Sequence, residues 1–278
     1  MRAGLSAVLV AGLLLLALPC HPEERSDEGP LSSPSAPEKV VPRSARDDES
    51  SGVPRSTRDD KSADRLRVLF IGNSFTYVND LPRIVTAMSR ADGGPTFDCR
   101  MVAFPGFSLE DHWRKGDARR AISDGPWDFV VLQQGPSSTD EGREILVEYA
   151  RRFAPLIRKA GGKPAFYGVW PASVRTQDFA GAEESYRQAA RVVQGLVLPA
   201  AEAWERSLRR NPSVALYGPD GLHPSPEGSY LAALVVYGGL SGRPIASVPA
   251  ALSLGGEGRL EIPDEDAAVL REAAAAVR

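Results

Sequence analysis

The stretch VLFIGNSFTYVNDLP, residues 68–82, decides the fold class of this chain. It opens with a continuous apolar run of strand length that ends at Gly72. We expect a helix to begin at Asp80, a residue type that caps helices well. Ser74 therefore lies where a buried strand gives way to a helix. Parallel α/β proteins expose reactive groups at such places, so Ser74 is either a turn residue or a functional one.

The alternation of strand and helix continues along the chain. Apolar runs predict strands over 66–72, 96–104, 127–135, 163–171 and, more briefly, from 195. The segments 78–94, 106–125, 141–162, 181–194, 200–210 and 224–242 have helical patterns, with Pro near several starts and Gly near several ends. Continuous apolar strands that alternate with helices predict an α/β fold with a parallel sheet of about five strands.

The composition is that of an ordinary globular protein. The 278 residues are 42% hydrophobic and 25% charged, with a net charge of -3. This is enough chain for one domain with a full core. No basic field points to a nucleic-acid partner.

Residues 1–20 predict export. Arg2 precedes an apolar run from Leu5 to Leu18 that is short for a membrane span. Cys20 follows this run and resembles a lipoprotein acceptor, although Pro19 fits that pattern poorly. The alternatives are a cleaved signal peptide, a lipid anchor at Cys20 and an uncleaved signal anchor. The expected location is periplasmic or extracellular.

Residues 21–64 have a different composition from the rest. They are rich in Pro, Ser, Arg and acidic residues, and they repeat VPRSARDDESS as VPRSTRDDKSA. With few apolar side chains the segment cannot offset its ordering entropy, so we expect a disordered tether. Residues 65–278 then form the folded domain. Cys99 would have no partner if Cys20 is lipidated or removed, so the fold does not depend on disulfides.

Ser74 can attack a substrate only if a base accepts its proton. Of the three histidines, His21 lies in the expected tether. His223 follows Asp220 by three residues in a segment rich in Pro and Gly, and such a carboxylate can orient an imidazole. A D-x-x-H pair also arises in helix caps. We expect His112, beside Trp113, to be a structural contact or a wall on the substrate side.

An oxyanion needs donors that are fixed before the reaction. The candidates are the backbone N–H groups of Ser74 and Gly106 and the amide side chains of Gln133 and Gln134, which close the third strand. Of the two glutamines we favour Gln133. No phosphate-binding or dinucleotide glycine motif follows a strand, and no cluster has metal-ligand spacing. The sequence therefore predicts neither a cofactor nor a metal.

FIGNSFT, the glycine of FPGFSLEDHW and DGLHPSPEGSYLAA resemble, in this order, conserved blocks of the SGNH, or GDSL-like, hydrolases. The resemblance covers residues 66 to about 242. It implies a flavodoxin-like three-layer α/β/α fold and a triad of Ser74, His223 and Asp220. Two departures stand out. Asn73 replaces an aspartate, and VVLQQG replaces a block with an asparagine oxyanion donor, as in some sialate and xylan acetylesterase-like members.

The resemblance implies an exported serine ester hydrolase, with carbohydrate O-acetyl esters as one substrate class. Its partner would be a small-molecule or glycan ester. The alternatives are a non-catalytic glycan-binding module on the same fold and an O-acyltransferase, because an acyl-serine can also be resolved by a sugar hydroxyl. A G-x-S-x-G elbow is absent around Ser74, which argues against the α/β-hydrolase fold.

Overall fold

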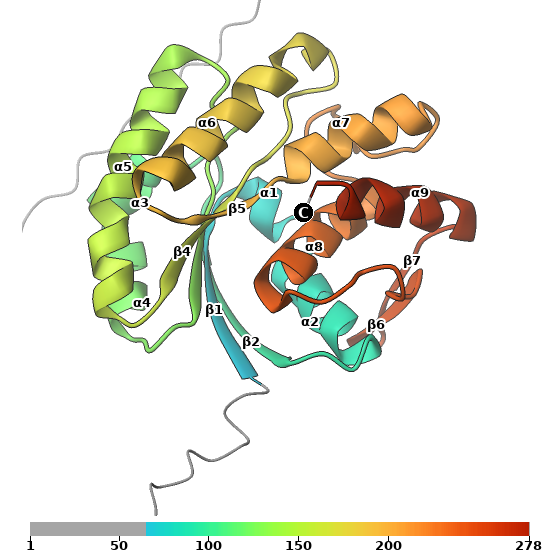
Figure 1. The fold of residues 1–278 in the computed structure, drawn as a ribbon, viewed down its shortest axis with the longest axis horizontal. Helices are drawn as coiled ribbons and strands as arrows, with labels where there is room; N and C mark the ends of the chain where they lie inside the picture. The colour runs from blue at the N-terminus through green and yellow to red at the C-terminus, as the bar shows by residue number, and fades with distance from the viewer. Residues whose placement is uncertain (1–64, 278) are drawn as a thin grey trace, which may run out of the picture. The chain divides into compact units, whose positions relative to one another are not determined.

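The computed structural model describes residues 65–277, which form a parallel sheet between two layers of helices (Figure 1). The five strands stand in the order β2-β1-β3-β4-β5. All neighbouring pairs are parallel. The predicted α/β/α fold with a parallel sheet of about five strands is confirmed. The strands are β1 (Arg65–Gly72), β2 (Thr96–Ala103), β3 (Phe129–Leu132), β4 (Lys163–Tyr167) and β5 (Leu196–Leu198).

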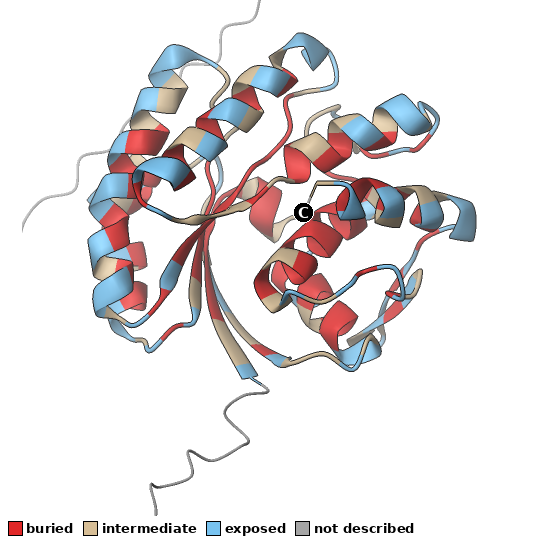
Figure 2. Ribbon diagram, in the orientation of Figure 1, coloured by how far each residue is buried: buried red, intermediate tan, exposed pale blue. Residues whose placement is uncertain are grey.

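One helical layer covers one face of the sheet. It includes α2, which contacts β2, and α8, which contacts β5, and the two helices contact each other. α9 covers α8 from outside, and α7 contacts both α8 and α9. Because α8 is enclosed by these neighbours, it is apolar on all sides and almost entirely buried (Figure 2). The helices of this layer are α2 (Leu81–Ala91), α7 (Ala200–Arg210), α8 (Pro226–Ser241) and α9 (Asp264–Ala275).

The opposite layer is a continuous row of helices in which α3, α4 and α6 each contact α5. In Figure 2 the buried faces of α5 and α6 point to the sheet and their exposed faces point outward. The row consists of α3 (Leu109–Lys115), α4 (Asp117–Ser123), α5 (Asp140–Lys159) and α6 (Phe179–Val192). A 3₁₀ turn, η2 (Thr176–Asp178), leads into α6.

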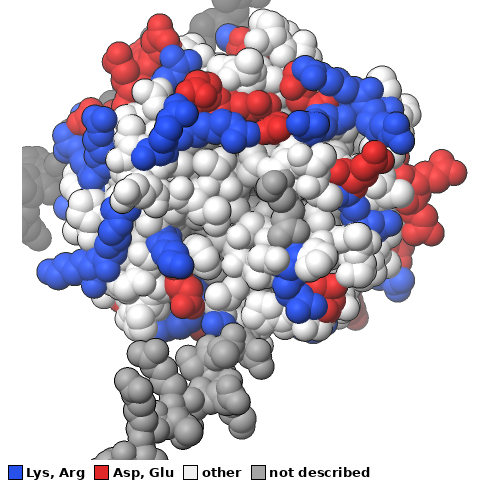
Figure 3. Space-filling model, viewed as in Figure 1, with Lys and Arg blue, Asp and Glu red and all other residues white. Residues whose placement is uncertain are grey.

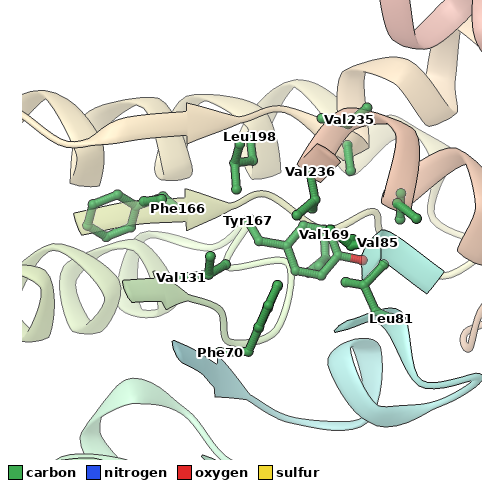
Figure 4. Packing of buried hydrophobic residues seen from close by; sticks show 14 of the residues in the cluster. Phe70, Leu81, Val85, Val131, Phe166, Tyr167, Val169, Leu198, Val235 and Val236 are labelled. Carbon is green, nitrogen blue, oxygen red and sulfur yellow. The ribbon is translucent and has the colours of Figure 1, made fainter. Parts of the chain in front are cut away.

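The core lies on both faces of the central strands. Figure 4 shows Tyr167 of β4 among apolar side chains of the sheet, α2 and α8. Tyr167 is fully buried, and its hydroxyl donates to the carbonyl oxygen of Phe75 at 3.5 Å. The core therefore reaches the segment that follows β1.

Strand register brings the carboxyl ends of the strands to one edge of the sheet. Gly72 stands opposite Ala103, and Leu132 stands opposite both Ile71 and Phe166. The residues that follow these strands consequently meet at that edge, as expected for parallel sheets.

Two features differ from the sequence-based expectations. Helical structure begins at Ser74, in the short helix α1 (Ser74–Tyr77), and not only at Asp80. Asn73 causes this early start, because its side chain caps the helix by accepting a hydrogen bond from the Phe75 N–H. In addition, an antiparallel hairpin, β6 (Ala251–Gly255) and β7 (Gly258–Glu261), and helix α9 follow α8.

The expected signal peptide, lipidation at Cys20 and tether lie outside the described residues. Within residues 65–277, no helix is long and apolar enough to cross a membrane.

Acidic and basic side chains are interspersed on the face shown in Figure 3, most densely near α6 and α7. Many charged side chains of residues 65–277 form ion pairs, such as Arg191 with Glu184 on α6 and Arg209 with Glu205 on α7, both at 2.6 Å. Exposed pairs of this kind each contribute about 0–1 kcal/mol to stability.

Candidate active site

A cleft of about 550 Å³ opens at the carboxyl edge of the sheet. The loops after β1, β2, β3 and β4 line it, together with Leu222 from the loop before α8. Its lining includes Ser74, Gly106, Gln134, Arg175 and Asp178. The cleft thus joins four of the segments in which the sequence predicts functional residues.

Ser74 is the first residue of α1 and is half-buried in the cleft. Its carbonyl oxygen accepts a hydrogen bond from the Val78 N–H at 2.9 Å. Within the described part of the chain, neither its hydroxyl nor its backbone N–H has a hydrogen-bond partner. Both groups are therefore free to interact with a substrate.

Asp220 and His223 form a direct pair. Asp220 Oδ2 accepts a hydrogen bond from His223 Nδ1 at 2.5 Å, and Asp220 Oδ1 accepts from the backbone N–H groups of Leu222 and His223 at 3.0 and 2.9 Å. The bond from His223, together with the two backbone bonds, lowers the pKa of Asp220 to about 2. The carboxylate is thus ionised near neutral pH. Because Nδ1 donates to it, the Nε2 of neutral His223 is left to accept a proton.

The loop that carries this pair is held from the side of β4. The Trp170 indole donates to the Leu222 carbonyl at 3.1 Å, and the Ser173 N–H donates to the Gly221 carbonyl at 2.8 Å. The Gly218 N–H donates to the His223 carbonyl at 2.8 Å. These contacts fix the backbone around the histidine.

The histidine loop and the Ser74 segment lie beside each other. The rings of Phe75 and His223 have centroids 6.1 Å apart, and Leu222 lines the same cleft as Ser74. No hydrogen bond joins Ser74 Oγ to His223 in residues 65–277. Catalytic hydrogen bonds are often long before substrate binds, so this arrangement is compatible with a resting site.

Gly106 follows β2 at the rim of the cleft. Its φ of 68° lies in the left-handed region that favours glycine, and an added Cβ would meet nothing within 4 Å. The N–H of Gly106 has no hydrogen-bond partner among the described residues. It is a second free backbone donor at the cleft.

The structure places Gln133 beneath the Ser74 turn and not in the cleft lining. Gln133 is fully buried. Its Oε1 accepts from the Asn73 N–H at 2.9 Å and from the Thr76 hydroxyl at 2.7 Å. Its Nε2 donates to Asn73 Oδ1 at 2.8 Å and to the Gln134 carbonyl. Both amide hydrogens are therefore in use, which leaves none for an oxyanion in this arrangement.

Gln134 lines the cleft, because consecutive side chains of an extended segment point to opposite sides. Its Oε1 accepts from the Leu109 N–H at 3.0 Å, and its Nε2 donates to Ser137 Oγ at 2.8 Å and to the Gly142 carbonyl at 3.1 Å. Its amide is thus satisfied by the protein. It ties the loop after β3 to the start of α3.

His112 lies in the interior, as the structural alternative predicted. It is fully buried, and its Nε2 lies 2.7 Å from the Gly72 carbonyl oxygen. Its ring contacts those of Phe104 and Phe107. Burial lowers the pKa of His112, although the bond to Gly72 and the nearby Asp111 and Asp117 act in the opposite direction.

The cleft wall also contains residues that the sequence did not single out. Arg175 Nε donates to Asp178 Oδ2 at 2.5 Å where η2 begins, so the wall carries a paired charge of each sign.

Asn79, another residue that the sequence did not single out, ties the Ser74 segment to the start of α8. An Asn-Asp pair before a helix indicates a turn, but it does not reveal the distant partner of Asn79. No group of three or more His, Cys, Asp or Glu suited to a metal occurs in residues 65–277.

No model of a known protein family matches this sequence. A search of curated proteins finds no match.

Solved structures do resemble the chain. A protein from Slackia heliotrinireducens, provisionally assigned to the SGNH hydrolases, has 28% sequence identity and a TM-score of 0.55, covering 63% of this chain and 99% of its own. A DUF4886 family protein from Bacteroides uniformis has 19% identity and a TM-score of 0.61, over 76% of this chain and 93% of its own. The lipase/acylhydrolase from Enterococcus faecalis has 16% identity and a TM-score of 0.52, over 69% of this chain and 99% of its own.

The last two likenesses concern the fold alone, whereas the first combines fold and sequence. Together with the order of strands and the position of the cleft, they confirm the resemblance that the sequence motifs indicated: this chain has the fold of the SGNH, or GDSL-like, hydrolases.

Proposed function

We propose that this protein is a serine ester hydrolase in which Ser74 is the nucleophile, His223 the general base and Asp220 the carboxylate that orients the base. The observation that carries the proposal is the Asp220–His223 hydrogen bond, formed in a loop next to the segment of Ser74. A serine with a free hydroxyl, an imidazole with a free Nε2 and a buttressing carboxylate are the groups that acyl transfer requires. The similarity to SGNH hydrolases supports the same chemistry.

In the proposed mechanism, Ser74 Oγ attacks the ester carbonyl carbon while His223 Nε2 accepts the hydroxyl proton. Asp220 stabilises the imidazolium that forms. Collapse of the tetrahedral intermediate breaks the bond to the alcohol oxygen, which takes the proton from His223. Water then attacks the acyl-serine with His223 again as base, and release of the carboxylic acid restores Ser74.

Two backbone donors are assigned to the oxyanion in this proposal, the N–H groups of Ser74 and Gly106. Both lie at the cleft and neither has a partner among the described residues. Gln134 becomes a third donor only if its Nε2 leaves Ser137 or Gly142. Gln133, the donor favoured from the sequence, has both amide hydrogens bonded within the protein.

We further propose carbohydrate O-acetyl esters as the substrate class, with the protein exported to the periplasm or the extracellular space, where a cleaved signal peptide and a lipid anchor on Cys20 are the alternatives. The export-type residues 1–20 and the glutamine pair of the third block support this. The cleft has polar walls from Ser137, Ser138 and Thr139 beside apolar side chains such as Ile145, which suits a sugar that carries a short acyl group.

The test is a panel of p-nitrophenyl esters of increasing chain length and of acetylated monosaccharides and xylo-oligosaccharides, assayed with the full-length protein. Ser74→Ala and Asp220→Asn serve as inactive controls. We expect hydrolysis that prefers acetyl groups and depends on Ser74. Binding of acetylated glycans without turnover would instead favour the glycan-binding module, and transfer to an added sugar in preference to water would favour the acyltransferase.

A further inference from the structure

One peptide group next to the nucleophile is held at both ends by buried side chains. The carbonyl of Gly72 accepts a hydrogen bond from His112 Nε2 at 2.7 Å. The N–H of the same peptide, which belongs to Asn73, donates to Gln133 Oε1 at 2.9 Å. Ser74 is the next residue. The two side chains come from α3 and from the end of β3, so they approach this peptide from different elements of the fold.

The identity of the partner fixes the tautomer of His112. A carbonyl oxygen only accepts, so Nε2 carries the proton and donates. The Nδ1 atom of this fully buried ring has no partner among the described residues. A buried ring nitrogen without a hydrogen-bond partner lowers stability. An apolar side chain of similar size would fill the same space without this unpaired nitrogen. The contribution of the imidazole at this position is therefore its bond to Gly72.

Gln133 organises the other side of the turn. It contacts Asn73 twice, through the Asn73 N–H and through Asn73 Oδ1 at 2.8 Å, and it accepts from the Thr76 hydroxyl at 2.7 Å. These groups fill the space beside Gly72 so fully that a Cβ on that residue would collide with Gln133 and Thr76. Glycine is thus required where the strand ends.

The network also reaches the second oxyanion donor. Asn73 Nδ2 donates to the Phe107 carbonyl at 3.0 Å, and Phe107 directly follows Gly106. The Phe104 N–H donates to the Gly72 carbonyl at 3.2 Å. The turn of Ser74 and the loop of Gly106 are therefore linked through the residues that His112 and Gln133 hold.

From these contacts we infer that His112 and Gln133 are positioning residues, which hold the Gly72–Asn73 peptide so that the hydroxyl and N–H of Ser74 face the cleft. This inference rests on the proposed function of Ser74. Both side chains are fully buried, so neither contacts substrate in this arrangement. If the peptide rotates, the directions of Ser74 Oγ and of its N–H change together. A displacement of about 1 Å at such a site can lower the rate on the order of 100-fold.

The test compares His112→Met, which fills the space without a donor, with His112→Gln, whose amide nitrogen can reach the Gly72 carbonyl. Thr76→Val removes one donor to Gln133 with little change of shape. Trp127→Phe is the matched control, because it removes hydrogen bonds from a buried side chain in the segment before β3, remote from the cleft. Each full-length variant is assayed for kcat, KM, melting temperature and the rate at which a fluorophosphonate probe labels Ser74.

We expect His112→Met to lower kcat and the labelling rate about 10- to 100-fold with little change in KM. His112→Gln should restore most of the loss, and Thr76→Val should lower both rates about fivefold, the value of one neutral hydrogen bond. Trp127→Phe should lower the melting temperature alone. Folded His112→Met that labels Ser74 at the wild-type rate would overturn the inference. If His112→Met does not fold, Thr76→Val decides in the same way.

The probe separates this inference from the proposed function. If the wild-type protein neither reacts with the fluorophosphonate nor hydrolyses any ester, the proposed function fails and the positioning role fails with it. If the wild-type protein reacts and the variants react equally fast, only the positioning role fails.

Discussion

The side-chain amide of Asn79 donates to the main-chain carbonyl of Pro224 at 3.1 Å, which joins the segment of Ser74 to the segment of His223. The same nitrogen also lies 3.3 Å from the Ser225 carbonyl and 2.9 Å from Ser229 Oγ. Asn79 has a φ of 58°, a left-handed conformation that brings its side chain to this position at some cost in strain. The Asn79 amide thus directly ties the segment of the nucleophile to the segment of the base.

Asn79→Gly tests this link. Glycine accepts the left-handed backbone, so the substitution removes the amide without adding strain. We expect kcat to fall on the order of tenfold with KM little changed, because the two catalytic segments can then shift relative to each other. Gln194→Gly is the matched control, since Gln194 has a φ of 50° and lies outside the cleft. An equal effect of both substitutions on kcat would contradict the role of Asn79.

The Asp220–His223 pair predicts a clear hierarchy among the histidines. His223→Ala removes the base and should lower kcat on the order of 10³-fold or more, and Asp220→Asn should have a comparable effect by favouring the wrong tautomer of His223. His112→Ala removes a positioning contact and not the base, so it should lower kcat about 10- to 100-fold and also lower the melting temperature, because the side chain is buried. Equal kcat losses from His112→Ala and His223→Ala would contradict these assignments.

The order of strands and helices could be predicted from the sequence because β1, β3, β4 and β5 contain apolar runs bounded by Gly, Pro or polar residues, whereas β2 mixes apolar and charged residues. The start of α1 could not, since a four-residue helix has no apolar period to detect. It depends on the Asn73 side chain, which also has distant partners in Gln133 and Phe107. The hairpin and α9 follow the last motif and carry only weak patterns.

Local motifs are enough to select four candidate residues, because each follows a strand or precedes a helix at the carboxyl edge of the sheet. These are Ser74, Gly106, Asp220 and His223. The choice between Gln133 and Gln134 could not be made in this way. An extended segment puts the two side chains on opposite sides, but only the neighbouring strand β1 determines which side faces the cleft. Sequence also gives no sign that Asn79 reaches Pro224, 145 residues away.

Gly106→Ala tests the second oxyanion donor. The left-handed backbone makes alanine unfavourable by about 1–2 kcal/mol. Gly93→Ala carries the same penalty, because Gly93 has a φ of 62° and a Cβ there would also meet nothing within 4 Å. We expect similar losses of melting temperature in both variants. Only Gly106→Ala should lower kcat, since its methyl group enters space at the rim of the cleft. If neither variant loses activity, Gly106 does not contribute to the site.

Gln134→Ala separates a structural from a catalytic role for this side chain. It leaves the buried N–H of Leu109 without its acceptor, so we expect a loss of about 1–3 kcal/mol in the free energy of unfolding. Gln188→Ala, on α6, is the control and should lower the free energy of unfolding much less. If Gln134 turns to donate to the oxyanion during the reaction, kcat should also fall ~10²–10³-fold. A stability loss with unchanged kcat would leave an oxyanion site of two backbone donors.

The burial of His112 predicts a specific dependence of stability on pH. In the unfolded chain a histidine titrates near its ordinary pKa of about 6.5. In the folded protein, burial lowers the pKa of His112, and its Nδ1 has no partner to receive the added charge. Between the two pKa values the unfolded state binds more protons, so the free energy of unfolding must fall as the pH falls below about 6.5. The slope from one such group is at most about 1.4 kcal/mol per pH unit.

His112→Gln isolates this contribution because glutamine keeps a donor for Gly72 but does not titrate. Urea unfolding of both proteins between pH 7.5 and 5 should therefore give a steeper loss of stability in the wild type. The charges near His112, those of Asp111 and Asp117 and of Lys115 over the Phe104 ring, are present in both proteins and cancel in the comparison. Asp220 does not interfere, since its pKa of about 2 keeps it ionised throughout this range. Parallel stability curves for the two proteins would show that the folded structure accommodates a protonated His112, which would contradict its assignment as a buried neutral donor.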